Sequence, residues 1–154
     1  MSDSKFDFNE LRRFVSRVDL RGIIAQECHA VRHSGAAPER VTVSLDTEVS
    51  ANRDSVDYRF TLSCEAFDEA DDAVADLSVV LLASFTVSEG PEVPEVIHHA
   101  FGANVAVMTA YPYLRQHVHD LANRIGLVNF TLGLMKLSDK SQGFSIVATG
   151  DSAH

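Results

Sequence analysis

Alternation of apolar and polar residues is clearest in two neighbouring segments, 41–49 and 56–66. In both, apolar residues recur at every second position, with Thr47 as the exception, and the residues between are polar or charged. A period of two residues predicts β-strands that bury one face and expose the other. Only the short polar connection 51–55 separates the segments, so we expect the two strands to pair antiparallel.

Two further segments predict strands with a less regular pattern. Residues 77–87 are apolar on both faces in the middle, which predicts a strand covered on both sides or one whose second face meets a partner. Residues 18–33 are apolar enough for a strand, but Gly22 breaks the alternation and predicts a bulge. The acidic segment 67–76 predicts a solvated hairpin loop, because its carboxylates lack the spacing of a calcium loop.

Helical periodicity replaces alternation in residues 94–137. Pro94 suits the first turn of a short helix, and Gly102 then predicts a hinge. Between Pro112 and Gly126, apolar residues recur at steps of four, three and four, which predicts a longer amphipathic helix that ends at Gly126. The apolar stripe consists of Leu114, Val118, Leu121 and Ile125.

A second set of residues repeats at helical spacing beside this stripe and mixes aromatic, imidazole and charged groups. It consists of Tyr113, His117, Asp120 and Arg124. Such a face suits a packing surface against another subunit, and it equally suits a solvated face whose ring lies on the core. Both interpretations stay open at this stage.

The two ends of the chain are less regular. Residues 1–17 predict a short helix capped by Asn9 or a loosely attached arm. Residues 127–137 predict a strand through the alternation of Phe130, Leu132 and Leu134, or a helix with Asn129 as its cap. Residues 138–154 are small and polar, and we expect a flexible tail apart from 144–148.

The order of these segments, four strands followed by helices, predicts the fold class. It is an α+β arrangement, with a four-stranded antiparallel sheet and helices packed on one face. At 154 residues the whole chain, 1–154, is expected to form a single domain with a sizeable core of its own.

Charge and cysteine content narrow the classes of partner and compartment. The net charge of −9 argues against nucleic acid and favours basic or unfolded polypeptide partners. No apolar run approaches a membrane span, and the polar N-terminus is unlike a signal peptide, so we expect a cytoplasmic protein with no membrane partner. Cys28 and Cys64 both fall inside predicted strands, where we expect buried structural thiols.

Motifs for catalysis or metal binding are absent from the sequence. It contains no H-E-x-x-H, C-x-x-C, nucleophile elbow or phosphate-binding loop. The histidine pairs at 98–99 and 117–119 are spaced so that they do not share one helical face. We therefore expect no metal, no cofactor and no enzymatic activity.

Short matches in the helical region carry a resemblance to a known family. They are HAFGA at 99–103, YPYLR at 111–115, a helix ending in NRIG at 123–126, and VNF at 128–130. In this order they resemble the protein-export chaperone SecB and its actinobacterial SecB-like relatives, over roughly residues 18–137. The run YPYLRQHVHDLANRIGL is most similar to the relatives that serve toxin–antitoxin systems.

The resemblance implies a fold, an assembly and a function. It implies the α+β layout described above, with protomers joined edge to edge and two dimers stacked on their long helices into a homotetramer. The family members are chaperones that hold unfolded or extended polypeptides in apolar grooves without ATP. The client is a preprotein in the export version, which also binds the SecA motor, or an aggregation-prone antitoxin in the other.

Candidate site residues follow from this resemblance together with the apolar segments that flank the long helix. The client-binding candidates are Ile97, Phe101, Val105, Val107, Met108, Leu127, Val128, Phe130, Leu132, Leu134 and Met135. Tyr113, His117, Asp120 and Arg124 are the interface candidates, and Asp19, Asp46 and Glu48 are the acidic candidates for motor docking. The alternatives are that the apolar residues only close the core, and that the chain is a non-chaperone scaffold module of the same fold.

Overall fold

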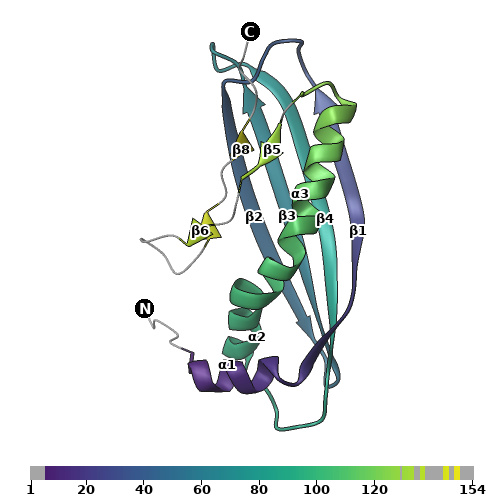
Figure 1. The fold of residues 1–154 in the computed structure, drawn as a ribbon, viewed down its shortest axis with the longest axis vertical. Helices are drawn as coiled ribbons and strands as arrows, with labels where there is room; N and C mark the ends of the chain where they lie inside the picture. The colour runs from purple at the N-terminus through teal and green to yellow at the C-terminus, as the bar shows by residue number, and fades with distance from the viewer. Residues whose placement is uncertain (1–5, 129, 134–135, 138–143, 146–147, 150–154) are drawn as a thin grey trace.

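Four long antiparallel strands form one sheet in the computed structural model of the protein (Figure 1). They lie in the order β1-β4-β3-β2, and the helices pack on one face, which confirms the predicted α+β fold. The strands are β1 (Val18–Arg32), β2 (Arg40–Ala51), β3 (Ser55–Phe67) and β4 (Ala73–Val87). The structure describes residues 6–128, 130–133, 136–137, 144–145 and 148–149.

The two clearly alternating segments pair as predicted. β2 and β3 run antiparallel in unbroken register from the pair Arg40 and Phe67 to the pair Ala51 and Val56. The apolar residues of both strands face the helices, and we call this side of the sheet its inner face. β4 begins at Ala73, earlier than predicted, because the turn before it is short.

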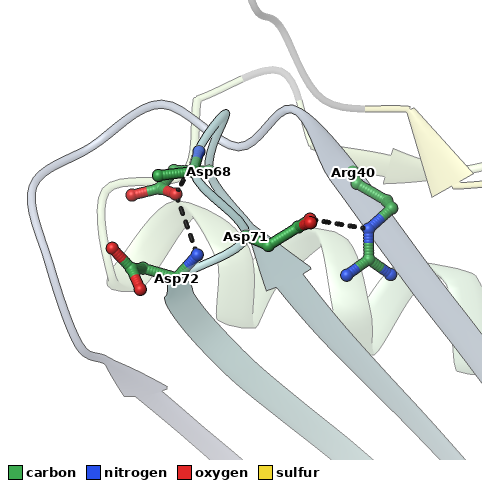
Figure 2. Close-up of polar contacts among 5 residues, drawn as sticks. Arg40, Asp68, Asp71 and Asp72 are labelled. Carbon is green, nitrogen blue, oxygen red and sulfur yellow. Dashed lines mark hydrogen bonds and ion pairs between the residues drawn. The ribbon is translucent and has the colours of Figure 1, made fainter.

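A hairpin turn joins β3 to β4, as the acidic segment predicts (Figure 2). The Asp68 side chain accepts hydrogen bonds from the backbone N–H groups of Ala70 and Asp72, both at 2.9 Å. Asp71 adopts a left-handed conformation with φ of 62°, which aspartate tolerates in turns. Its carboxylate lies 3.3 Å from the Arg40 guanidinium on β2. These carboxylates therefore order the turn.

The first strand and the segment after it link opposite edges of the sheet. Among the described residues β1 pairs with β4 alone, and it shows the irregularity predicted at Gly22, together with a second one between Ala25 and Glu27. The following segment, 33–39, crosses one end of the sheet to reach β2. The Arg32 guanidinium donates hydrogen bonds to the carbonyl oxygens of Ala36 at 3.0 Å and Ile125 at 3.2 Å. It thereby ties this segment to the end of the long helix.

The helical region is continuous, so the predicted hinge at Gly102 is wrong. Helix α2 (Glu95–Phe101) leads into a π-helical turn, η1 (Gly102–Ala106), and then into α3 (Val107–Arg124). Gly102 keeps an ordinary helical conformation, with φ of −57°. Pro112 lies on the exposed side of α3 and does not start the helix. Gly126, with φ of +79°, follows the helix end and is the stop that the sequence predicts.

The core lies between α2, α3 and the inner faces of β3 and β4. Leu114 and Val118 of the predicted apolar stripe are fully buried, whereas Leu121 and Ile125 are half-buried. An aromatic cluster closes the other end of the core. The Phe101 ring lies 5.2 Å from the rings of Phe14 and Phe85 and 5.6 Å from that of Tyr58, measured between centroids.

The N-terminal segment packs on the body of the protein. Helix α1 (Phe8–Val15) lies against α2, and its Leu11 and Phe14 are buried. The Asp7 side chain accepts a hydrogen bond from the Asn9 backbone N–H at 2.9 Å. Asp7 is therefore the cap, and the predicted cap at Asn9 is wrong.

Short strands form after α3. β5 (Thr131–Leu132) pairs with β8 (Ala148–Thr149), and β6 (Lys136–Leu137) pairs with β7 (Phe144–Ser145). The strand interpretation of 127–137 is thus correct at β5 and β6, and the helix interpretation is wrong there. β8 lies beside β2 (Figure 1). Most of the predicted flexible tail, together with Leu134 and Met135, lies outside the described residues.

Candidate functional site

The inner side of β2 is an apolar strip that the helices leave partly uncovered. Helix α3 packs over β4, β1 and β3, so the inner residues of β3 and β4 are buried. Those of β2 are only half-buried, apart from Thr47, which is exposed. We call this strip the β2 face; it consists of Val41, Val43, Leu45, Thr47 and Val49. It offers partly solvated apolar surface directly beside an edge of the sheet.

A pocket of about 250 Å³ continues the β2 face toward the helices. It lies between β2 and β3 on one side and α2 with the π-helical turn on the other. Its lining residues are Thr47, Val49, Tyr58, His99, Gly102 and Ala103. The volume is below the roughly 300–1,000 Å³ of small-molecule sites, so the pocket suits one apolar side chain of a longer ligand.

The floor of this pocket is a close contact between Gly102 and the Tyr58 ring. A Cβ atom at residue 102 would lie only 2.7 Å from Cε1 of Tyr58. Tyr58 is fully buried, and its hydroxyl donates a 2.7 Å hydrogen bond to the carbonyl oxygen of His98. Burial raises the pKa of Tyr58, so the ring remains neutral. The absence of a side chain at Gly102 therefore keeps the pocket open.

Two histidines of α2, His98 and His99, lie next to this pocket. Burial is the main cause that lowers the pKa of His98, and the neighbouring His99 lowers it further. His99 lines the pocket, and its Nε2 lies 3.5 Å from the Glu95 carboxylate in an exposed contact. His98 therefore favours its neutral form, and its neighbour His99 contributes a polar ring to the pocket lining.

The predicted client-binding residues divide between core and surface. Met108 and Val128 are exposed, and Val105 is half-buried. Six others are buried in the described chain: Ile97, Phe101, Val107, Leu127, Phe130 and Leu132. The buried members are unavailable to a ligand without rearrangement, and their packing supports the core interpretation. Leu134 and Met135 lie outside the described residues.

The predicted interface residues follow one side of α3. Tyr113, Asp120 and Arg124 are exposed, and His117 is half-buried. The Nδ1 atom of His117 lies 4.0 Å from the Cys28 sulfur on β1. Within the described residues, Tyr113, Asp120 and Arg124 therefore leave this side of α3 exposed, next to the β1 edge.

The acidic docking candidates all lie on the outer face of the sheet, but not together. Asp19 is on β1, whereas Asp46 and Glu48 are on β2 at the opposite edge, with β3 and β4 between them. The Glu48 carboxylate lies 3.8 Å from the Arg59 guanidinium. Asp46 and Glu48 thus form one acidic site beside the β2 edge, and Asp19 is separate from it.

Metal-ligand clusters and membrane-spanning helices are both absent from the described part of the chain. It holds no group of three or more His, Cys, Asp or Glu side chains arranged to bind a metal ion. None of its helices is both long enough and apolar enough to cross a membrane.

The two cysteines differ in environment, contrary to the expectation that both are buried. Cys64 is 1% exposed on the inner face of β3, whereas Cys28 is exposed on β1. The bulges of β1 and its place at the sheet edge explain the exposure. Burial raises the pKa of the Cys64 thiol to about 12.

This difference predicts selective thiol labelling. In a Cys28→Ser variant, we expect Cys64 to stay unmodified by iodoacetamide at pH 8 in the folded protein, because the thiolate is the reactive form. It should react fully after unfolding in guanidinium chloride, as intact mass measures. The wild-type protein is the control, and its Cys28 should react without denaturant. Rapid native labelling of Cys64 would contradict the burial described here.

Comparison with known proteins finds the same architecture in a solved structure. No family model matches the sequence, and a sequence search of curated proteins finds no match. A Mycobacterium tuberculosis SecB-like chaperone, Rv1957, solved in complex with a ChAD peptide from the Rv1956 HigA1 antitoxin, superposes with a TM-score of 0.76. The match covers 83% of this chain and 97% of that chain at 22% identity. The protein therefore has a SecB-like fold.

Proposed function

We propose that this chain is an ATP-independent chaperone that holds unfolded or extended polypeptides. The observation that carries the proposal is the β2 face, a partly solvated apolar strip that ends in a pocket large enough for one side chain. The SecB-like fold supports it, and so does the net charge of −9, which attracts basic segments of unfolded chains. Holding works by mass action, because a binder of the unfolded state keeps that state from aggregating.

An antitoxin is the client class that the comparison favours over preproteins. The mycobacterial structure contains a peptide from an antitoxin, and its fold covers most of this chain. Motor docking, the property of the export version, has weaker support here because Asp19 is separated from Asp46 and Glu48. We also propose a cytoplasmic homo-oligomer, assembled through the exposed side of α3 that carries Tyr113 and Arg124.

The proposed client-binding surface differs from the residues that the sequence suggested. We propose the β2 face and its pocket as the main contact. Of the earlier candidates, the surface residues Val105, Met108 and Val128 remain as flanking contacts. Apolar surface of this kind binds varied sequences because it excludes water without demanding matched polar groups.

The test is suppression of aggregation by a variant that blocks the pocket. Thr47→Arg places a long cation at the exposed pocket rim, and an apolar client side chain could then no longer enter without burying charge. We expect about tenfold more variant than wild type to be needed to prevent light scattering by a chemically denatured protein, which corresponds to about 1.4 kcal/mol. Ser63→Arg, on the outer face of β3, is the matched control and should behave as wild type.

Two results would contradict the proposal. Wild-type protein that is folded but leaves the scattering of the denatured client unchanged would rule out a holdase. Stoichiometric binding of one folded protein, without binding of unfolded chains, would instead assign the chain to the scaffold alternative. If Thr47→Arg and Ser63→Arg lose the same amount of aggregation-suppressing activity, the β2 face is not the client-binding site.

A further inference from the structure

Helix α1 is held on the body of the protein by few contacts. Leu11 and Phe14 are its buried side chains, and the helix packs against α2. Among the described residues, no hydrogen bond joins 6–15 to another element. Just after the helix, the Arg17 guanidinium donates hydrogen bonds to two backbone carbonyl oxygens of segment 88–91, both at 3.0 Å. α1 is therefore docked by apolar side chains and anchored at its C-terminal end.

The histidine that contacts this helix has an unpaired nitrogen. The His98 ring on α2 meets the Phe14 ring at an angle of 89°, with the centroids 5.2 Å apart. Nδ1 of His98 is buried, and no described residue forms a hydrogen bond with it. Buried polar atoms are normally paired. A neutral imidazole tolerates this position when Nδ1 carries no proton, whereas an imidazolium would bury an N–H donor that has no acceptor.

Charged groups near His98 do not supply that acceptor. On its own helix, His99 disfavours and Glu95 favours the charged ring, and both stay beside His98 whether or not α1 is docked. On β3, the Tyr58 hydroxyl is engaged with the His98 carbonyl oxygen and leaves the ring unpaired. The other charged groups line a hollow of about 160 Å³ between α1 and the start of α2, and they are Glu10, Arg13, Arg17 and Glu92. Their charges balance, and none of them is hydrogen-bonded to Nδ1.

From this arrangement we infer that α1 is a pH-sensitive flap, docked while His98 is neutral and released when the His98 ring takes up a proton. Release lets the new N–H group meet water, and the helix moves about its anchor at Arg17. This switch does not depend on the function proposed above. Its consequence is that acid uncovers apolar side chains on both surfaces of the contact, namely Leu11 and Phe14 on α1 and the Phe101 ring that Phe14 contacts.

The direction of the pH effect follows from the burial of the ring. Burial is the main cause that lowers the pKa of His98 below the 6.5 of an ordinary histidine. Docking is therefore strongest above about pH 6.5 and weakens as the pH falls below that value, because the released state binds the proton more tightly. One proton changes the docking equilibrium by at most about tenfold per pH unit.

Hydrogen exchange of the full chain, followed by mass spectrometry, tests the switch. A released helix of eight residues is too short to persist alone, so its amides exchange. Protection factors, corrected for the intrinsic pH dependence of exchange, should fall at least about threefold for 11–15 between pH 7.5 and pH 5.5. Those of β3 should stay constant. Constant protection of α1 would overturn the inference, and so would an equal loss in β3, since acid would then unfold the whole protein.

Two histidine variants identify the group that titrates. His98→Asn keeps a polar group at this position but cannot take up a proton, so protection of α1 should no longer depend on pH. His99→Asn is the matched control, because His99 is an exposed neighbour on the same helix, and this variant should keep the pH dependence of the wild type. If the dependence persists in His98→Asn, or is lost only in His99→Asn, the switch is not His98.

The reverse measurement checks the same coupling from the side of the proton. If protonation of His98 releases α1, then loss of α1 docking must raise the pKa of His98. Phe14→Ala should therefore raise the His98 pKa in an NMR titration of the imidazole protons. Phe8→Ala, which removes a ring that is 70% exposed, should leave it unchanged. An unchanged or lowered pKa in Phe14→Ala would contradict the inference, because the Phe14 ring would then attract the imidazolium instead of excluding it. The His98→Asn experiment decides independently if Phe14→Ala does not fold.

Discussion

Replacement of Phe101 by alanine should lower the free energy of unfolding by about 3–5 kcal/mol, the range typical of buried phenylalanines. Phe101 is 2% exposed, and its ring contacts Phe14 of α1, Tyr58 of β3 and Phe85 of β4. It therefore joins three separate elements to the start of the helical region. Equilibrium unfolding in urea, followed by circular dichroism, measures the loss.

The control for this variant is Phe8→Ala. Phe8 is 70% exposed on α1, so removal of its ring should change stability by less than about 0.5 kcal/mol. A loss of similar size in both variants would indicate that α1 as a whole, and not the ring cluster around Phe101, determines the effect. Loss below about 1 kcal/mol for Phe101→Ala would contradict the packing described here.

Replacement of Gly102 by alanine should destabilise the protein by about 1–3 kcal/mol, even though alanine is the better helix former. The new Cβ would approach the Tyr58 ring to 2.7 Å. That ring cannot easily move, because it is fully buried and its hydroxyl is bonded to the His98 carbonyl. Thermal or urea unfolding measures whether the variant is less or more stable than wild type. Helix propensity alone would make it more stable by about 1 kcal/mol.

Gly22→Ala is the matched control for Gly102→Ala. No atom lies within 4 Å of a Cβ built at Gly22, so alanine there should be neutral or slightly stabilising. If Gly102→Ala stabilises the protein as well, the close contact beneath the pocket does not exist in solution.

The fold was predictable because alternation and helical periodicity dominate the chain. The strands at 41–49 and 56–66 needed no tertiary information, since one buried face imposes a period of two. The hinge at Gly102 was wrong for a physical reason. From sequence alone, a glycine in a helical segment predicts a break in the helix. Here the helix continues, and glycine is required because the Tyr58 ring, 44 positions away in sequence, leaves no room for a Cβ atom.

The candidate site was less predictable. The sequence-based set followed apolar residues near the long helix, and helix packing buries those that face the sheet, such as Ile97 and Phe101. The β2 face was visible as the alternation of Val41 and Val43 with polar residues, but the alternation does not tell how far the helices cover it. Coverage depends on α3 lying over β4 and β1, which only the three-dimensional arrangement shows.

The pairing of β1 with β4, a strand distant in sequence, has a consequence for synthesis on the ribosome. Even the pair of this ladder that is closest in sequence, Arg32 with Ala75, is separated by 43 residues. At about 5–20 residues per second, β1 waits roughly 2–9 s for its partner to be translated. For at least that time Ile23, which packs against the core and pairs with Ala83 in the folded protein, has no sheet to join. The nascent chain therefore exposes apolar side chains of β1 until β4 has been translated.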